Sequence, residues 1–71
     1  MKIKYDAEAD AAYISFKKGP QQVTTIRVND DVAIDLGESE EIVGIEILSA
    51  SANLGFPKGA PKVELENLKV A

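Results

Sequence analysis

The sequence predicts an α+β protein that is mostly β, with a five-strand antiparallel meander sheet and a short helical cap after the last hairpin. The first observation is the segment 32–48, where apolar β-branched residues alternate with small or acidic residues on both sides of an acidic turn. This period of two is typical of a half-buried antiparallel hairpin. The second observation is that three more segments repeat the alternation or are rich in β-branched residues. The third is a serine- and alanine-rich segment that follows the hairpin and ends at a glycine, as short helices do.

The alternation and the turn residues set the limits of the five strands. We expect strands at residues 2–5, 12–16, 23–28, 32–36 and 42–48. The three-residue loop between the third and fourth strands keeps Ile26 and Ile34 on one face, because a loop with an odd number of residues preserves the phase of the alternation. In this register Thr25 lies opposite Asp35, and Arg27 lies diagonal to Asp35, within reach of an exposed ion pair.

The two faces of the predicted sheet differ in chemistry. Pairing of the last two strands places Gly44 opposite Asp35 and Ala33 opposite Glu46, so the open face of this hairpin is small and acidic. The other face is aliphatic and supplies the core. The alternation also turns Tyr13 toward the open face.

A short helix is expected after the last strand. The segment contains helix-compatible alanines, a serine able to cap its start, and Gly55 placed to end it. Such a helix packs Leu54 and Phe56 over the sheet. Residues 1–56 then form the sheet domain, and residues 57–71 form a C-terminal tail that is either an extended segment or a strand added to a sheet edge.

Composition limits the classes of function. The 71 residues contain neither cysteine nor histidine, which excludes disulfides, thiolate metal sites and the commonest general base near neutral pH. The net charge of −4 disfavours nucleic-acid binding, and no apolar run reaches the roughly 18 residues of a membrane span. We therefore expect a cytoplasmic, non-enzymatic protein without a cofactor. A chain of this size buries only about 60% of the surface that its unfolded form exposes, so we also expect a homo-oligomer, namely a dimer.

One acidic motif resembles the start of a calcium-binding loop. Asp6, Glu8 and Asp10 occupy the first, third and fifth positions of that pattern, but the sixth is Ala11 instead of glycine and the twelfth is Lys17 instead of glutamate. These mismatches favour a solvated turn that bonds its own backbone. Cation binding by the three carboxylates is the alternative.

A second set of residues is a candidate interaction surface on the open face. It consists of Tyr13, Arg27, Asp35, Gly44 and Glu46. An aromatic side chain among small residues is suited to contact with a second chain, whereas in the alternative the tail covers Tyr13 through Val63 or Leu65. Asp35 and Glu46 resemble the paired carboxylates of hydrolases. Catalysis by such a pair needs shifted pKa values, and these need burial that a solvent-exposed sheet face does not provide.

Two motifs at a fitting separation resemble a known family. They are MKIKYDAEAD at residues 1–10 with YISF at 13–16, and VAIDL at 32–36 with IVGIEIL at 42–48 and the Ser/Ala segment that ends at Leu54. Over about residues 1–55 the chain is similar to domain-of-unknown-function family 2283, whose members are small prokaryotic proteins. The turn at 38–41 lacks the glycine common in that family, Ala12 replaces a larger aliphatic residue, and the tail has no counterpart. The resemblance implies a small antiparallel sheet with a helical cap and no assigned activity.

These observations lead to one functional hypothesis and two alternatives. We expect a non-enzymatic protein–protein interaction module that acts as a homodimer. The resemblance implies a first alternative, an antitoxin-like inhibitor of a small basic toxin, because members of the family are associated with small toxin-like proteins. The acidic turn with Glu38, Glu40 and Glu41 suits such a basic partner. A weak metal-binding protein or a small enzyme is the second alternative.

Overall fold

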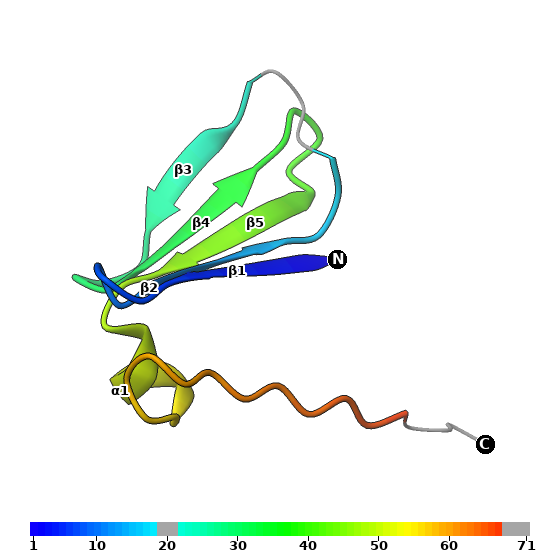
Figure 1. Cartoon of the computed structure of the whole chain (residues 1–71). Coiled ribbons are helices and arrows are strands. Elements are labelled where there is room, and N and C mark those ends of the chain that lie inside the picture. Colours follow the sequence, from blue (N-terminus) through cyan, green and yellow to red (C-terminus); the bar gives the residue numbers. More distant parts are fainter. Residues whose placement is uncertain (19–21, 68–71) are drawn as a thin grey trace.

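The computed structural model describes residues 1–18 and 22–67 of the chain. In this part of the chain, five antiparallel strands form a sheet and a short helix follows the last strand (Figure 1). The elements are β1 (Lys2–Asp6), β2 (Ala11–Ser15), β3 (Thr24–Arg27), β4 (Val32–Leu36), β5 (Ile42–Ile47) and α1 (Ala50–Leu54). The predicted class, strand number and helix position are confirmed. No helix within the described residues is long and apolar enough to cross a membrane.

The order of the strands differs from the predicted meander. Across the sheet the order is β1-β2-β5-β4-β3, so β5 is central, and β1 and β3 form the edges. The meander is wrong because it paired β2 with β3, its neighbour in sequence. Instead β2 pairs with β5, which sets Ala12 against Ile47 and Ile14 against Ile45. The alternation within a strand fixes its faces but does not specify its partner.

The strand register places one isoleucine from each strand in a single row across the sheet. In order from the β1 edge to the β3 edge, the residues are Ile3, Ile14, Ile45, Ile34 and Ile26. We call these five residues the isoleucine row. The row lies on the aliphatic face, and the predicted phase between the third and fourth strands is confirmed.

The opposite face carries polar and small residues. On it Asp35 lies opposite both Thr25 and Gly44, and Ala33 lies opposite Glu46, as predicted. We call this surface the polar face. Its residues are Lys2, Lys4, Asp6, Ala11, Tyr13, Ser15, Thr25, Arg27, Ala33, Asp35, Gly44 and Glu46.

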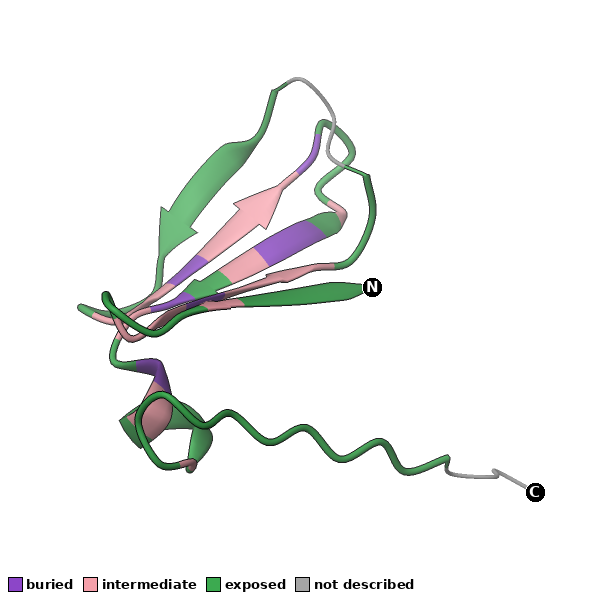
Figure 2. Cartoon of the chain, in the orientation of Figure 1, coloured by how far each residue is buried: buried purple, intermediate pink, exposed green. Residues whose placement is uncertain are grey.

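The core lies where α1 meets one end of the aliphatic face. Ala50 packs against Ala12 and Ile47, and all three are buried. The ring of Phe56 stands edge-on to that of Tyr5, with 5.1 Å between the ring centroids. Ile14 and Ile45 of the isoleucine row pack against this core, whereas the edge strands β1 and β3 are mostly exposed (Figure 2).

Backbone conformation sets the ends of α1. Gly55 adopts a left-handed conformation with φ of 74° and donates its N–H to the Ser51 carbonyl, so the predicted glycine stop is confirmed. The predicted serine cap is wrong: Ser49 is itself left-handed, and its side chain makes no capping hydrogen bond. The carboxylate of Asp10, from the β1–β2 turn, accepts a hydrogen bond from the Ser51 N–H at 3.1 Å. A residue distant in sequence therefore satisfies the first turn of the helix.

The tail leaves α1 on the aliphatic side of the sheet. A turn closes where Ala60 N–H donates to the Pro57 carbonyl at 2.9 Å. Residues 61–67 are exposed and join no strand, and the tail runs away from α1 below the sheet in the view of Figure 1. Of the two predicted forms, the added strand is therefore not found in residues 57–67, and residues 68–71 lie outside the described residues.

Candidate functional site

The Asp35 carboxylate links three strands on the polar face. Tyr13 of β2 donates its hydroxyl to Asp35 Oδ2 at 2.8 Å, and Thr25 of β3 donates its hydroxyl to Asp35 Oδ1 at 2.6 Å. Because β5 lies between β2 and β4, the Tyr13 side chain must cross β5 to reach Asp35. It crosses at Gly44, where a Cβ atom would collide with the tyrosine ring. Gly44 is thus the residue that allows the Tyr13–Asp35 contact.

An ion pair crosses the polar face in the neighbouring row. Arg27 Nη2 lies 3.5 Å from Glu46 Oε1, and both side chains are about half exposed. Ala33 pairs with both of these residues and is only 3% exposed, so the two long side chains meet over it. The predicted pairing of Arg27 with Asp35 is wrong. Two hydroxyls occupy Asp35, whereas Glu46 lies in the same row as Arg27.

The five residues predicted as an interaction surface therefore lie together, but they are engaged with one another. Tyr13 is half-buried, and its hydroxyl is used by Asp35. The alternative in which the tail covers Tyr13 is also wrong, because Val63 lines a hollow on the opposite, aliphatic side with Ile3. The hydrogen bond to Asp35 raises the pKa of Tyr13, with partial burial as a second cause. Tyr13 therefore stays protonated near neutral pH.

This pKa shift can be measured because the chain contains only two tyrosines. Partial burial raises the pKa of Tyr5 as well, so we expect both phenols to titrate above the ordinary value of about 10. In Asp35→Asn, only the Tyr13 pKa is expected to fall, and Tyr5 serves as an internal reference. The measurement is the absorbance of tyrosinate against pH. Identical curves for Asp35→Asn and the wild-type chain would contradict the Tyr13–Asp35 contact.

A second polar cluster joins the β1–β2 turn to α1, and we call it the Asp10 junction (Tyr5, Asp10, Ala50 and Ser51). The Asp10 carboxylate accepts hydrogen bonds from the Tyr5 hydroxyl at 2.8 Å and the Ser51 hydroxyl at 2.7 Å, besides the Ser51 N–H. The backbone carbonyl of Asp10 accepts the Ala50 N–H at 2.8 Å. The Ser51 hydroxyl is the largest cause that lowers the pKa of Asp10, against an opposing effect of partial burial. The carboxylate is thus held in its charged form.

The acidic motif at the β1–β2 turn bonds the chain itself. Asp6 Oδ1 accepts the backbone N–H groups of Glu8 and Ala9 at 3.0 and 3.4 Å, which confirms the predicted self-bonded turn. Asp10 faces Ser51 and Tyr5. Within the described residues, no group of three acidic, histidine or cysteine side chains is arranged to hold a metal ion.

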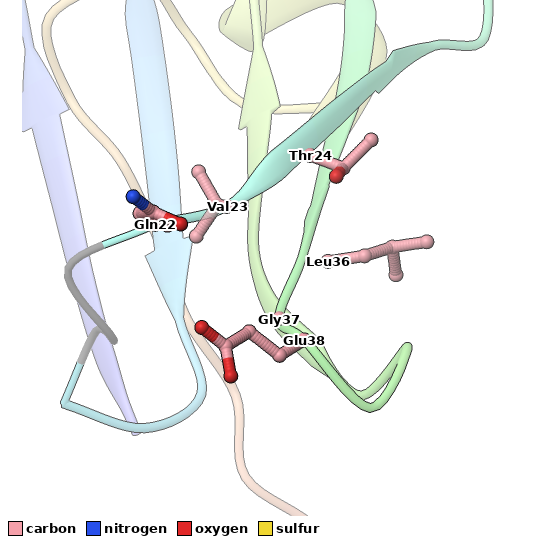
Figure 3. A pocket seen from close by; sticks show the side chains of 6 residues that line it. All are labelled: Gln22, Val23, Thr24, Leu36, Gly37 and Glu38. Atoms are coloured by element: carbon pink, nitrogen blue, oxygen red, sulfur yellow. The ribbon is translucent and has the colours of Figure 1, made fainter.

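A hollow of about 530 Å³ lies at the end of the β3–β4 hairpin, lined by Gln22, Val23, Thr24, Leu36, Gly37 and Glu38 (Figure 3). In this view Val23 and Glu38 extend to one side, whereas Thr24 and Leu36 extend to the other. The Thr24 hydroxyl and the Glu38 carboxylate therefore do not converge as a nucleophile and its base.

Comparison with known proteins places the chain in a family. The family model described as "Protein of unknown function (DUF2283)" matches residues 2–51, which is more than half of the chain. The chain belongs to the DUF2283 family. The resemblance to this family is therefore confirmed. The DUF2283 match contains the whole sheet and the Asp10 junction, with Ser51 as its last residue, and leaves out the tail.

A relative of this DUF2283 chain is the uncharacterized protein MJ0789 of Methanocaldococcus jannaschii. The two are 43% identical over 51 residues, which amount to 72% of this chain and 42% of the relative. The matched region thus spans less than half the length of that protein. No solved structure matches the chain.

The partners of these DUF2283 side chains were only partly predictable. The sequence singled out Asp10 for its charge, but its partner Ser51 lies 41 residues away, and no local pattern links the two. The small residues Gly44 and Ala33 were predicted on the open face. Their role as crossing points for longer side chains depends on the strand order, which the sequence did not reveal.

Proposed function

We propose that this domain is a non-enzymatic protein–protein interaction module that forms a homodimer through the isoleucine row. The row supports the proposal because it is a line of β-branched apolar side chains that α1 and the tail cover only in part. None of the five is fully buried, and the two at the sheet edges, Ile3 and Ile26, are 41% and 47% exposed. Contiguous exposed apolar surface of this kind marks interaction sites.

The exposed area of the chain supports a second copy as the partner. A folded monomer of 7.6 kDa exposes about 4,300 Å² by the usual scaling with mass, whereas this chain exposes 5695 Å². Part of the surplus belongs to the exposed tail. A standard interface covers about 800 Å² of each partner, so the surplus of about 1,400 Å² is an upper limit that exceeds one such interface before the share of the tail is subtracted. A dimer also gives the aliphatic face the second layer that a sheet needs.

The polar face is a weaker candidate for the interface than the sequence suggested. Its central acceptor, Asp35, already receives two hydroxyl groups, and Arg27 is paired with Glu46. A partner that bound there would have to replace these contacts. The aliphatic face requires no such exchange.

The proposal predicts that a charge in the isoleucine row weakens the dimer. We expect the wild-type chain to have twice its chain mass of 7.6 kDa by size-exclusion chromatography with light scattering. Ile26→Lys is expected to weaken dimerisation by about 10- to 100-fold, because the burial of one isoleucine is worth about 1.5–3 kcal/mol. Ile26 lies on an edge strand and is nearly half exposed, so the substitution leaves the core intact.

The matched control is Thr25→Lys, which places the same side chain at the preceding residue of β3, on the polar face. This substitution removes the hydroxyl that bonds Asp35 but leaves the isoleucine row unchanged. We expect it to remain dimeric. A monomeric wild-type chain at all concentrations, or equal weakening by the two substitutions, would overturn this interface. The antitoxin-like and metal-binding alternatives stay predictions, since no contact among the described residues favours either of them.

A further inference from the structure

We propose that the tail of one protomer adds to the β1 edge of a second copy as a sixth strand, antiparallel to β1. This inference rests on the self-association proposed above and names a further part of its interface. The pairing segment is residues 62–66, which lie within the described part of the tail.

The tail and β1 have complementary patterns of charge and apolar residues. With Glu64 opposite Lys4, the charged pairs are Lys62 with Asp6, Glu64 with Lys4 and Glu66 with Lys2, and the apolar pairs are Val63 with Tyr5 and Leu65 with Ile3. All three charged residues of β1 lie on the polar face, and Ile3 and Tyr5 lie on the aliphatic face. Every cross-strand pair thus joins opposite charges or two apolar side chains, and such pairs stabilise strand pairing. In a parallel arrangement, the two lysines of β1 can still lie opposite Glu64 and Glu66, but Lys62 then does not lie opposite Asp6.

Both segments have unused backbone groups. Among the described residues, β1 pairs with β2 alone, so in this part of the chain its outer edge presents free N–H and C=O groups, which are a template for another strand. In the tail, Val63 is 60% exposed and Leu65 is 85% exposed. Addition of the tail to the edge would satisfy the backbone of both and would place the two tail side chains beside the isoleucine row.

The start of the tail lies on the aliphatic face of its own sheet, and not beside the outer edge of its own β1. The Gly59 N–H donates to the Tyr5 hydroxyl at 3.0 Å, and Tyr5 lies on the aliphatic face. Beyond this contact, Pro61 and Val63 line a hollow of about 260 Å³ with Ile3 on the same face. The tail therefore begins below its own sheet, and not beside it (Figure 1).

Face-to-face packing brings this tail to the partner's edge. Two sheets that pack through their faces lie about 10 Å apart. The tail of one protomer starts below its own aliphatic face, which is the side on which the partner's sheet lies. The tail is therefore close to the plane of the partner's sheet. Twofold symmetry makes the exchange reciprocal, so both β1 edges are covered.

A disulfide between the two segments tests the exchange, because the natural chain has no cysteine that could interfere. In the double variant Lys4→Cys with Glu64→Cys, the proposed register brings the two Cβ atoms into the range of about 4.5–5.5 Å, close to that of a disulfide. Isotope-labelled and unlabelled chains are mixed, equilibrated and oxidised mildly. We expect covalent dimers whose bridged peptides include labelled–unlabelled pairs by mass spectrometry. Lys4→Cys with Glu38→Cys is the matched control and should give no such bridge.

Charge reversal gives a second readout that does not depend on oxidation. Glu64→Lys and Lys4→Glu should each weaken the dimer by about tenfold, and the two changes combined should restore most of the loss. Glu38→Lys makes the same charge change on the acidic turn and should leave the dimer unchanged.

The outcomes separate this inference from the homodimer itself. A wild-type chain that is monomeric by light scattering overturns both. A dimer without the bridge, or with bridges only within one chain, overturns the exchange and leaves the isoleucine-row interface standing. A bridge between chains together with charge rescue supports the exchange.

Discussion

Gly44→Ala is expected to destabilise the wild-type chain by about 1–2 kcal/mol and to stabilise a chain in which Tyr13 is already alanine. The added Cβ atom collides with the outer end of the Tyr13 side chain. Since that end is movable and the backbone of β5 is not, we expect the ring to leave its place over Gly44. The hydrogen bond from Tyr13 to Asp35 is then lost.

In the Tyr13→Ala background, Gly44→Ala is expected to stabilise the chain, because the tyrosine ring that would collide with the added Cβ atom is absent. What remains is the ordinary advantage of alanine over glycine within a strand, about 0.5–1 kcal/mol. Urea denaturation of the four chains, at one fixed protein concentration, gives the coupling energy directly. Equal effects of Gly44→Ala in the two backgrounds would contradict the crossing of β5 by Tyr13.

The tyrosine titration provides an independent check on the same variant. Because the bond to Asp35 is the first cause of the raised Tyr13 pKa, we expect this pKa to fall toward its ordinary value in Gly44→Ala. The stabilising effect of the bond is present below the unfolded pKa of about 10 and is lost as the pH rises through the raised folded pKa. The difference in stability between Gly44→Ala and the wild-type chain should therefore narrow at high pH.

Local alternation was sufficient to predict the faces of the sheet, but not the contacts across it. Ile26 and Ile34 were assigned to one face, and Asp35 and Gly44 were paired, because a period of two and the loop length decide both. The strand order was beyond such reasoning, since the pairing of β2 with β5 joins segments that are distant in sequence. The isoleucine row becomes visible only with that order.

The same limit explains the errors at the candidate site. Arg27 was matched to Asp35 by a diagonal within one hairpin, but its actual partner, Glu46, lies two strands away in the same row. For the acidic motif, the self-bonded turn was predicted correctly, but its own spacing could not show which donors Asp10 uses. The donors that Asp10 uses come from Ser51 and Tyr5, and only the folded chain brings Ser51 close to it.

Asp10→Asn is expected to lower the melting temperature by several degrees at neutral pH. Asparagine tolerates the left-handed conformation of this position, where φ is 50°, so the substitution tests the carboxylate and not the backbone. The carboxylate accepts three hydrogen bonds from Tyr5 and Ser51, whereas an amide has only one oxygen and presents an NH₂ group to the remaining donors. The loss loosens the attachment of α1 to the β1–β2 turn, and thermal melting followed by circular dichroism measures it.

The pH dependence of this loss identifies the charge as its cause. The hydrogen bonds from Ser51 lower the folded pKa of Asp10, so its contribution to stability is fully present above the unfolded pKa of about 3.9 and disappears as the pH falls through the lower folded value. We therefore expect the melting curves of Asp10→Asn and the wild-type chain to converge below about pH 4. Asp30→Asn removes the same charge from the exposed β3–β4 loop and serves as the control. A difference between Asp10→Asn and the wild-type chain that stays constant down to the acid limit would mean that the charge of Asp10 does not hold α1 in place.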